Sequence, residues 1–252
     1  MKVLQNTFTL LDLFLTGDPE MSLDDLSRLS GINKTTISRI VAELVQSGYL
    51  MQQEKRGKYS LGYKYFDFTG HIKNQIRERD IAIPFLMKLA HAVDETVIMA
   101  MWNGGTAAIT ESFHANHVLK VVPDEGRGLP LHSTSLGKVI LANIGRNQFN
   151  DIYKDRELER YTANTMTDLN DLKPQLAVIR QQGIAYDDEE TYPHVRGIAS
   201  VLKNFRGDVV GGVGVIGPSV RLTREKLKEL VVPVRTCAED ISYALGLPRN
   251  GQ

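Results

Sequence analysis

The chain is poor in cysteine and tryptophan, and its charges are balanced. Cys237 is the one cysteine among 252 residues, which excludes an internal disulfide and a multi-cysteine metal site. Lysine plus arginine and aspartate plus glutamate both number 30, so the chain as a whole gives no electrostatic reason to expect nucleic acid. With 42% hydrophobic residues and no low-complexity tract, its length suits two domains with separate cores.

Long hydrophobic runs are missing as well. No stretch of about 18 apolar residues occurs, so we expect no membrane-spanning helix. Residues 1–6 lack the apolar segment and the small-residue cleavage site of a signal peptide. We therefore expect a soluble cytoplasmic protein with a reduced cysteine, no metal and no cofactor.

The segment that begins at Ser22 predicts two short helices separated by one glycine. Ser22 is a good N-cap, and Asp25 lies three residues later, as in a capping box. Gly31 can adopt the positive φ of a tight turn, and Asn33 can cap the second helix. This spacing is typical of a helix-turn-helix, preceded here by a helix that ends near Thr16.

The second helix divides into an apolar and a polar face. The apolar residues recur at helical spacing and predict a buried stripe: Ile37, Ile40, Val41, Leu44 and Val45. The polar face carries the donors that phosphates and base edges need. With the N-cap, the predicted DNA contacts are Ser22, Lys34, Thr35, Thr36, Ser38 and Arg39. Such residues often form only the solvated face of a helix. Here the preceding helix and the wing predicted after it favour DNA contacts instead.

Positive charge is concentrated after residue 30. Residues 1–30 carry two basic and five acidic side chains, whereas residues 31–62 carry five basic and two acidic ones. Residues 49–62 predict two short strands joined by a basic tip, which after such a helix is typical of a wing. We expect Lys55, Arg56 and Lys58 to contact backbone phosphates.

The rest of the chain predicts a second, larger domain. We place a first domain at 1–62, a linker helix at 63–76 and a second domain at 77–252. In the second domain we expect strands at 96–102, 106–113, 118–122, 184–187, 198–203 and 208–216. Helices are expected at about 134–144, at 168–182 with Thr167 as cap, and at 224–245 with Thr223 as cap. The result is an α+β fold around a largely antiparallel sheet.

Four patches together resemble the IclR family of bacterial transcription regulators. They are the segment 23–50 ending in Gly48-Tyr49-Leu50, Tyr59-Ser60-Leu61-Gly62, Pro130-Leu131-His132-Ser133-Thr134-Ser135-Leu136-Gly137-Lys138, and Asp187-Asp188-Glu189-Glu190. The resemblance implies a winged helix-turn-helix followed by a GAF-like effector-binding domain. It also implies a homodimer or tetramer on a near-palindromic operator, with a small organic acid as effector.

The resemblance also implies where the effector binds. The matching positions are Val121, Leu129, Ser135, Leu136, Asp187, Val195, Gly197, Gly214 and Ile216. Gly197 stands where many members carry a cysteine, and Gly214 and Ile216 replace small hydroxyl residues of the glyoxylate-responsive member of the family. We expect a roomier and more apolar pocket than one for a two- or three-carbon acid.

Several motifs have a competing interpretation. Ser135-Leu136-Gly137-Lys138 matches the Ser-x-x-Lys of acyl-serine enzymes, but their other motifs do not follow, and a serine at a helix start more often caps or binds a carboxylate. The glycines of 212–217 match a dinucleotide fingerprint, yet they lie in an apolar strand followed by a proline.

Acidic, histidine and aromatic side chains offer further candidates. The four acids 187–190 are expected to form a turn, with Asp187 inward and three outside, rather than a cation site. His114 and His117 are two ligands short of a metal site, and His132 suits structural hydrogen bonding. Trp102 and Phe113 either line the cavity or belong to the core.

The sequence thus predicts a ligand-responsive transcriptional regulator, most simply a repressor of a catabolic operon. The effector must bind the DNA-competent and DNA-incompetent arrangements with different affinity, and the helix 63–76 would carry this difference between domains. An activator of the same family is the first alternative. A small-molecule enzyme that uses Ser135 and Lys138 is the second.

Overall fold

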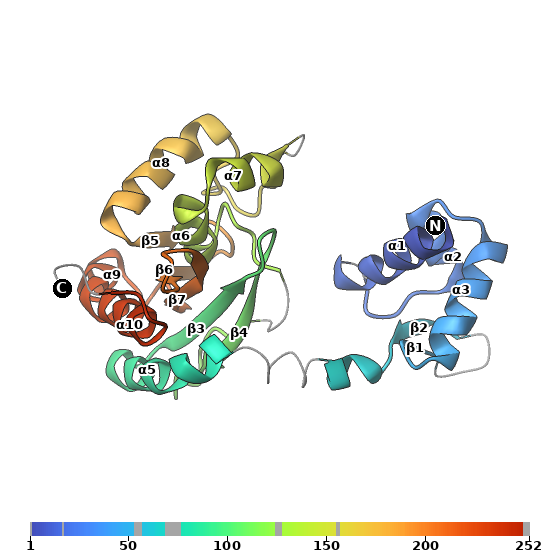
Figure 1. Cartoon of the computed structure of the whole chain (residues 1–252), viewed down its shortest axis with the longest axis horizontal. Coiled ribbons are helices and arrows are strands. Elements are labelled where there is room, and N and C mark those ends of the chain that lie inside the picture. Colours follow the sequence, from blue (N-terminus) through green and yellow to red (C-terminus); the bar gives the residue numbers. More distant parts are fainter. Residues whose placement is uncertain are drawn as a thin grey trace. The chain divides into compact units, whose positions relative to one another are not determined.

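The chain folds into two compact units, Met1–Ile76 and Arg77–Gln252 (Figure 1). The computed structural model describes residues 2–16, 18–52, 57–68, 77–123, 128–154 and 157–248. Within these ranges, no helix is long and apolar enough to cross a membrane.

The first unit is a small helical domain with a two-stranded sheet. Its elements are α1 (Lys2–Thr16), α2 (Leu23–Ser30), α3 (Lys34–Gln46), β1 (Leu50–Gln52) and β2 (Tyr59–Leu61). The three helices share one core, to which Leu10, Leu26 and Ile37 contribute fully buried side chains. This burial holds α2 and α3 in a fixed relation, because each helix presents its apolar stripe to the same cluster.

The turn between α2 and α3 has the predicted chemistry. Ser22 and Asp25 form a capping box at the start of α2. Gly31 ends that helix with φ of 68°, a left-handed conformation that costs a glycine little. The Asn33 side chain then accepts a hydrogen bond of 2.9 Å from the Thr36 amide and caps α3. The helix-turn-helix prediction is confirmed.

The strands that follow α3 form the predicted hairpin. β1 and β2 are antiparallel, with Met51 opposite Ser60. Met21, just before α2, pairs with Tyr59 through two backbone hydrogen bonds and ties the hairpin to the helices. The tip residues 53–56, with the predicted contacts Lys55 and Arg56, lie outside the described residues. A helical turn occupies 64–68, and the remainder of the expected linker helix, 69–76, also lies outside them.

The second unit is built on one antiparallel sheet. Its strands are β3 (Thr96–Trp102), β4 (Ala107–Phe113), β5 (Ala185–Asp188), β6 (Val195–Lys203) and β7 (Val209–Pro218), in the order β4-β3-β7-β6-β5. Its helices are α5 (Arg77–Val93), α6 (Ser135–Asn143), α7 (Arg146–Tyr153), α8 (Leu169–Gln182), α9 (Arg224–Glu229) and α10 (Val231–Ala244). This is the expected α+β architecture.

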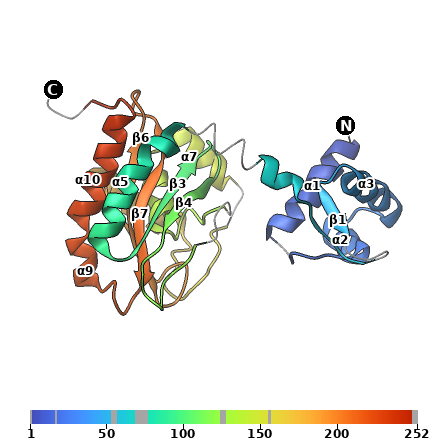
Figure 2. The same cartoon turned by 90° about the horizontal axis from the view of Figure 1, so that it is seen from below.

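Helices cover both faces of the sheet (Figure 2). Val97 and Met99 of β3 contribute to a core with α5 and α10. Ile98 and Ala100, which alternate with them, contribute to a second core with α6 and α8. This alternation follows from the two-residue period of a strand, and it gives the α6 side of the sheet its own set of residues.

Four details of the predicted elements are wrong. Residues 118–122 form no strand, and the Val121 carbonyl accepts a hydrogen bond from the Thr96 side chain. Asp168, not Thr167, caps α8. Helix α7 was not predicted; its apolar side is short, since Phe149, Ile152 and Tyr153 pack against the α6 core but none of them is fully buried.

The last helix is also divided. The expected helix 224–245 breaks at Leu230 into α9 and α10. Pro233 lies in the first turn of α10, and its lack of an N–H prevents the hydrogen bond that one continuous helix would need there.

Gly211 allows β7 to lie close to β3, and this contact is testable. A Cβ atom at Gly211 would lie 2.1 Å from the carbonyl oxygen of Ala100. We expect Gly211→Ala to lower the free energy of unfolding of the second unit by about 1–3 kcal/mol or more, because the strands must move apart. Calorimetry of the full chain measures this change. Gly105→Ala is the matched control, since nothing lies within 4 Å of its Cβ position, and an equal loss there would contradict the account.

Candidate DNA interface and effector site

The outer face of α3 carries most of the predicted DNA contacts. Lys34, Thr35, Ser38 and Arg39 are exposed. Thr36 is half-buried, and its amide is used in the cap with Asn33. The opposite face of the helix is buried in the core. The helix therefore presents a continuous row of donors while its apolar side fixes its orientation.

Ser22 has a structural task at the start of α2. Its hydroxyl donates to Asp25 Oδ2 at 2.7 Å and accepts from the Asp25 amide at 3.2 Å. The hydrogen bonds from the Ser22 side chain and backbone, with one from Arg28, lower the pKa of Asp25 to about 2. Ser22 thus stabilises the helix that supports α3. A direct DNA contact by this residue stays a prediction.

The basic side chains of this unit differ in their partners. Lys34 forms an ion pair with Asp24, and both side chains are largely exposed. An exposed pair of this kind contributes little stability, so Lys34 can exchange its carboxylate for a phosphate at low cost. Among the described residues, no carboxylate lies within ion-pair range of Arg39. Lys58, next to β2, is exposed.

The predicted effector positions converge at one end of the large sheet, on its α6 side. Strand pairing places Ile216 opposite Gly197, and Gly197 opposite Asp187. Ile216 also pairs with Thr96, whose side chain binds the Val121 carbonyl at 2.9 Å. These positions therefore form one row across the sheet from Val121 to Asp187.

The start of α6 covers this row. Ser135 is the first residue of α6, and its Oγ lies 2.9 Å from where a Cβ atom on Gly197 would be. Thr134 caps the helix by accepting from the Gly137 amide at 3.0 Å. The amides of Ser135 and Leu136 precede the first intrahelical bond, so they are the donors that a helix start offers to an anion.

Other predicted positions lie further from this centre. Leu136 packs toward Gly212, one strand position beyond Gly214 on the same face. Leu129 is half-buried beside β4, where its amide donates to the Ala107 carbonyl. Val195 begins β6 and pairs with Pro218.

The glycines of this face serve close packing. A Cβ atom at Gly197 would lie 2.9 Å from Ser135 Oγ and 3.2 Å from Ile216 Cγ2. One at Gly214 would lie 2.6 Å from the Ile198 carbonyl oxygen. Neighbouring atoms therefore already occupy the space beside these two glycines, and the expectation of a roomier pocket stays a prediction.

A buried ion pair lies beside the row. Lys138 is fully buried on α6, and its ammonium donates to Glu190 Oε1. The Glu190 amide donates to Asp187 Oδ1 at 2.8 Å. The expectation of one inward acid and three outside is wrong, since Glu190 is as buried as Asp187. Glu189 has φ of 62°, and this left-handed turn returns the chain inward one residue later.

Sequence reasoning missed the role of Lys138, although a signal was present. Lys138 precedes the run Val139-Ile140-Leu141-Ala142, and all of these residues are buried. A lysine within an apolar helix needs a buried carboxylate partner, because an unpaired buried charge is costly. The acids 187–190 were the candidates for that partner.

Asp187 is buried and holds its proton unusually well. Burial, with a smaller contribution from the Glu190 charge, raises the pKa of Asp187 to about 7, although hydrogen bonds from the Glu190 amide and Thr191 and the Lys138 charge act in the opposite direction. The Lys138 ammonium binds Glu190 rather than Ser135. Among the described residues, the geometry therefore gives Ser135 no basic partner and does not favour the acyl-serine interpretation.

The remaining motifs have structural roles. Residues 212–217 lie inside β7, so the dinucleotide fingerprint lacks its helix. His117 pairs with Asp94, and no group of three potential metal ligands occurs in the described part of the chain. His132 binds the Glu159 carbonyl at 2.8 Å. Trp102 borders the α6 core, whereas Phe113 packs on the opposite face of the sheet.

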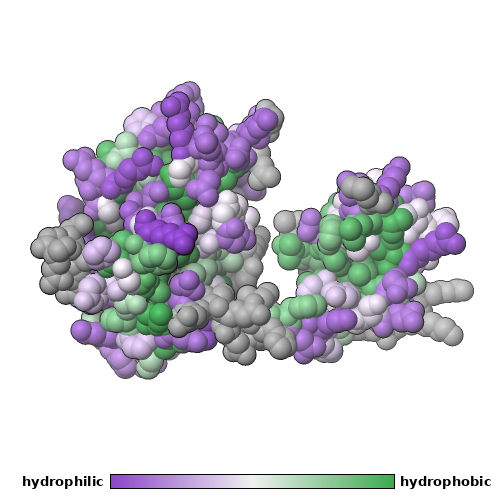
Figure 3. Space-filling model, viewed as in Figure 1, coloured by the Kyte–Doolittle hydropathy of each residue, from purple (hydrophilic) through white to green (hydrophobic). Residues whose placement is uncertain are grey.

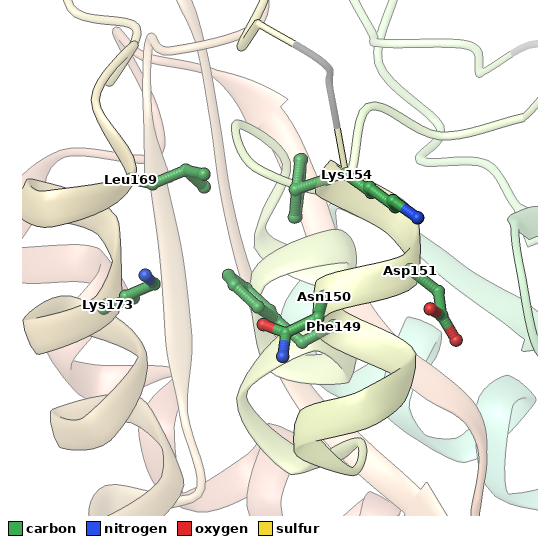
Figure 4. A pocket seen from close by; sticks show the side chains of 7 residues that line it. Phe149, Asn150, Asp151, Lys154, Leu169 and Lys173 are labelled. Carbon is green, nitrogen blue, oxygen red and sulfur yellow. The ribbon is translucent and has the colours of Figure 1, made fainter.

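A surface pocket lies between α7 and α8 (Figure 4). Phe149 and Asn150 of α7 face Leu169 and Lys173 of α8 across it. None of the predicted effector positions lines this pocket. It is therefore separate from the row under α6.

The buried ion pair makes a testable contribution to stability. We expect Lys138→Met to cost about 3–5 kcal/mol, because it leaves Glu190 buried without its cation. The double variant Lys138→Met/Glu190→Met should recover most of this loss, since it removes both charges of the pair and leaves neither without its partner. Urea denaturation compares the three chains. A double variant as unstable as the single one would contradict the account.

Asp187 should make stability depend on pH. Its pKa is higher in the folded chain than the ordinary 3.8, so the folded state binds the proton more tightly and stability falls as pH rises from about 4 to about 7. Asp187→Asn cannot ionise and should remove this part of the fall. Denaturation midpoints at about pH 5 and about pH 8 measure the difference. If the unaltered chain and the Asp187→Asn variant lost the same stability between these two pH values, this role for Asp187 would be excluded.

Family models match both units of the chain. The model for the IclR helix-turn-helix domain matches residues 3–54, and the model for the bacterial transcriptional regulator IclR C-terminal matches residues 73–243. The regulator KipR of Bacillus subtilis is 28% identical over 97% of both chains. The regulator KdgR of Dickeya chrysanthemi is 30% identical over 92% of this chain and 76% of its own length.

Solved structures agree with this assignment. A putative IclR transcriptional regulator from Silicibacter has the same fold, with a TM-score of 0.84, 23% identity and coverage of 99% of this chain and 98% of that one. IclR of Thermotoga maritima has a TM-score of 0.70 and 26% identity over 98% of this chain and 99% of its own. The expected family, fold class and absence of enzymatic activity are confirmed. The chain belongs to the IclR family, and it is a DNA-binding transcriptional regulator.

Proposed function

We propose that this regulator is a repressor of a catabolic operon in the bacterial cytoplasm, and that a small carboxylate metabolite releases it from its operator. The observation that carries the DNA part is the division of α3 into a buried apolar face and an exposed face with Lys34, Ser38 and Arg39. Arg39 would read a base, while Lys34 and the wing residues Lys55, Arg56 and Lys58 would contact phosphates.

The effector part rests on the row under α6. The amides at the start of α6 and the Ser135 hydroxyl would bind the carboxylate of a sugar acid or an aromatic acid. Asp187, whose pKa is about 7, would donate or accept a hydrogen bond to the same ligand. Such a ligand changes operator affinity only if it binds the two arrangements of the chain differently.

Repression is favoured by two relatives. Proteins of Salmonella that are 27% identical over 98% of this chain are named transcriptional repressor AllR. An activator is the alternative within the family. A reporter fused to the upstream region distinguishes the two, because deletion of the gene raises expression for a repressor and lowers it for an activator.

The α3 face gives the sharpest test of DNA binding. We expect Arg39→Ala to weaken binding to the DNA upstream of the gene by about 1–3 kcal/mol if Arg39 contacts a guanine. Fluorescence anisotropy at several salt concentrations measures the change. Arg28→Ala is the matched control, because Arg28 is exposed on α2 and pairs with Asp25. Equal effects of the two variants, or none from Arg39→Ala, would refute the assignment.

The effector site is tested by ligand-dependent stabilisation. We expect gluconate, galacturonate or 4-hydroxybenzoate to raise the melting temperature of the full chain if it binds the folded state. Ser135→Ala should reduce that shift at least fivefold. Ser112→Ala, on β4, should leave it unchanged. A shift that survives Ser135→Ala would place the ligand elsewhere.

A further inference from the structure

The C-terminal end of α3 binds a lysine that lies beyond the wing. In Figure 3 hydrophilic side chains gather on the side of the first unit where α3 lies in Figure 1. The last turn of α3 carries no basic residue. Lys64 instead donates a hydrogen bond of 3.1 Å from Nζ to the Ser47 carbonyl oxygen. Carbonyls at a helix end lack intrahelical partners and carry partial negative charge, so Lys64 supplies the cation that α3 itself lacks.

The Tyr49 ring fixes the position of this lysine. Lys64 Nζ lies 4.5 Å from the centre of the Tyr49 ring, in a cation–π contact. Phe68 stacks on the same ring with the ring centres 6.0 Å apart, and Tyr65 meets it edge-on at 5.8 Å. All three partners of the ring belong to the helical turn 64–68. One side chain next to α3 therefore orders this turn and its ammonium group.

Two glycines bring the turn close to the end of α3. The Gly62 amide donates to the Tyr49 carbonyl at 2.8 Å. A Cβ atom at Gly62 would lie 2.1 Å from the Gly48 carbonyl oxygen, so this approach requires a glycine. Among the described residues, the partners of the Lys64 ammonium are the Ser47 carbonyl and the Tyr49 ring. The lysine is thus directed to the helix end.

We propose that Lys64 is a positioning residue for DNA recognition, which acts through α3 rather than on the DNA itself. The inference rests on the proposed contact between the outer face of α3 and a duplex. The core fixes the apolar face of α3, and Lys64 fixes its end against the turn 64–68. Without this second attachment the helix can tilt, so that Arg39 meets its base less often. The loss should fall on specific binding, because base contacts need one geometry whereas every duplex offers phosphates.

Fluorescence anisotropy of the full chain tests this role on two duplexes, the region upstream of its gene and an unrelated sequence of equal length. Lys64→Met keeps the length of the side chain and loses its charge. We expect it to weaken binding to the upstream region about fivefold or more, because a charged hydrogen bond and a cation–π contact are lost. Lys64→Arg should restore binding, since a guanidinium can make both contacts. Lys88→Met, exposed on α5, is the control for the loss of one charge.

The salt dependence separates this role from a phosphate contact. A lysine that binds a phosphate would weaken both duplexes alike when it is replaced, and the salt slope would fall by about 1. We expect Lys64→Met to leave the slope and the binding of the unrelated duplex unchanged. A fall in slope with equal losses on both duplexes would overturn the proposal, as would full affinity in Lys64→Met.

A double-mutant cycle with Arg39 excludes a general loss of folding as the explanation. Arg39→Ala should cost less in the Lys64→Met chain than in the unaltered chain, because α3 no longer presents Arg39 correctly. Additive losses would overturn the positioning role while leaving the α3 contact with DNA intact. No effect of Arg39→Ala in the unaltered chain would overturn both. Melting temperatures of the same variants show that each chain is folded when its binding is measured.

Discussion

The buried ion pair between Lys138 and Glu190 determines how the second unit is assembled. It joins α6 to the turn after β5, and no other described ion pair has a fully buried cation. The same turn holds Asp187 in the row that crosses the sheet to Ile216. Because an unpaired buried charge is costly, α6 and this turn must stay together in the folded state. The start of α6 and the acid of the sheet are thereby held at one site.

In the first unit, the two faces of α3 have different roles. Its apolar face is fixed by the core with α1 and α2, and its polar face is left for DNA. Ser22, Gly31 and Asn33 shape the turn and contribute no net charge. Of the residues that orient α3 and those that would contact DNA, Ser22 and Thr36 belong to both sets, since they take part in the caps and are predicted DNA contacts, but Lys34, Thr35, Ser38 and Arg39 have no part in the caps or the core. A change at one of these four residues can alter affinity without unfolding the unit.

The parts of the structure that depend on interactions within a few residues could be predicted from the sequence. Caps, helical spacing and the glycine at 31 predict the helix-turn-helix, because each acts within a few residues. The sequence shows that Lys138 needs a buried carboxylate and offers the acids 187–190, but it does not single out Glu190, which lies 52 residues away. The prediction of a strand at 118–122 was wrong for a related reason. An apolar run does not show whether a neighbouring strand is available for it to pair with. The space beside Gly197 could not be predicted either, because Ser135, which occupies it, belongs to a helix that is far away in the sequence.

We propose that an oligomer of this chain places its α3 helices on two related half-sites of the DNA that it regulates. Footprinting of the full chain on the region upstream of its gene tests this claim most directly. The account predicts protection of two similar half-sites whose centres are about one helical turn, roughly 10 base pairs, or a multiple of it apart. Protection should weaken steeply with salt. No protection at low salt, or equal protection of unrelated duplexes, would contradict it.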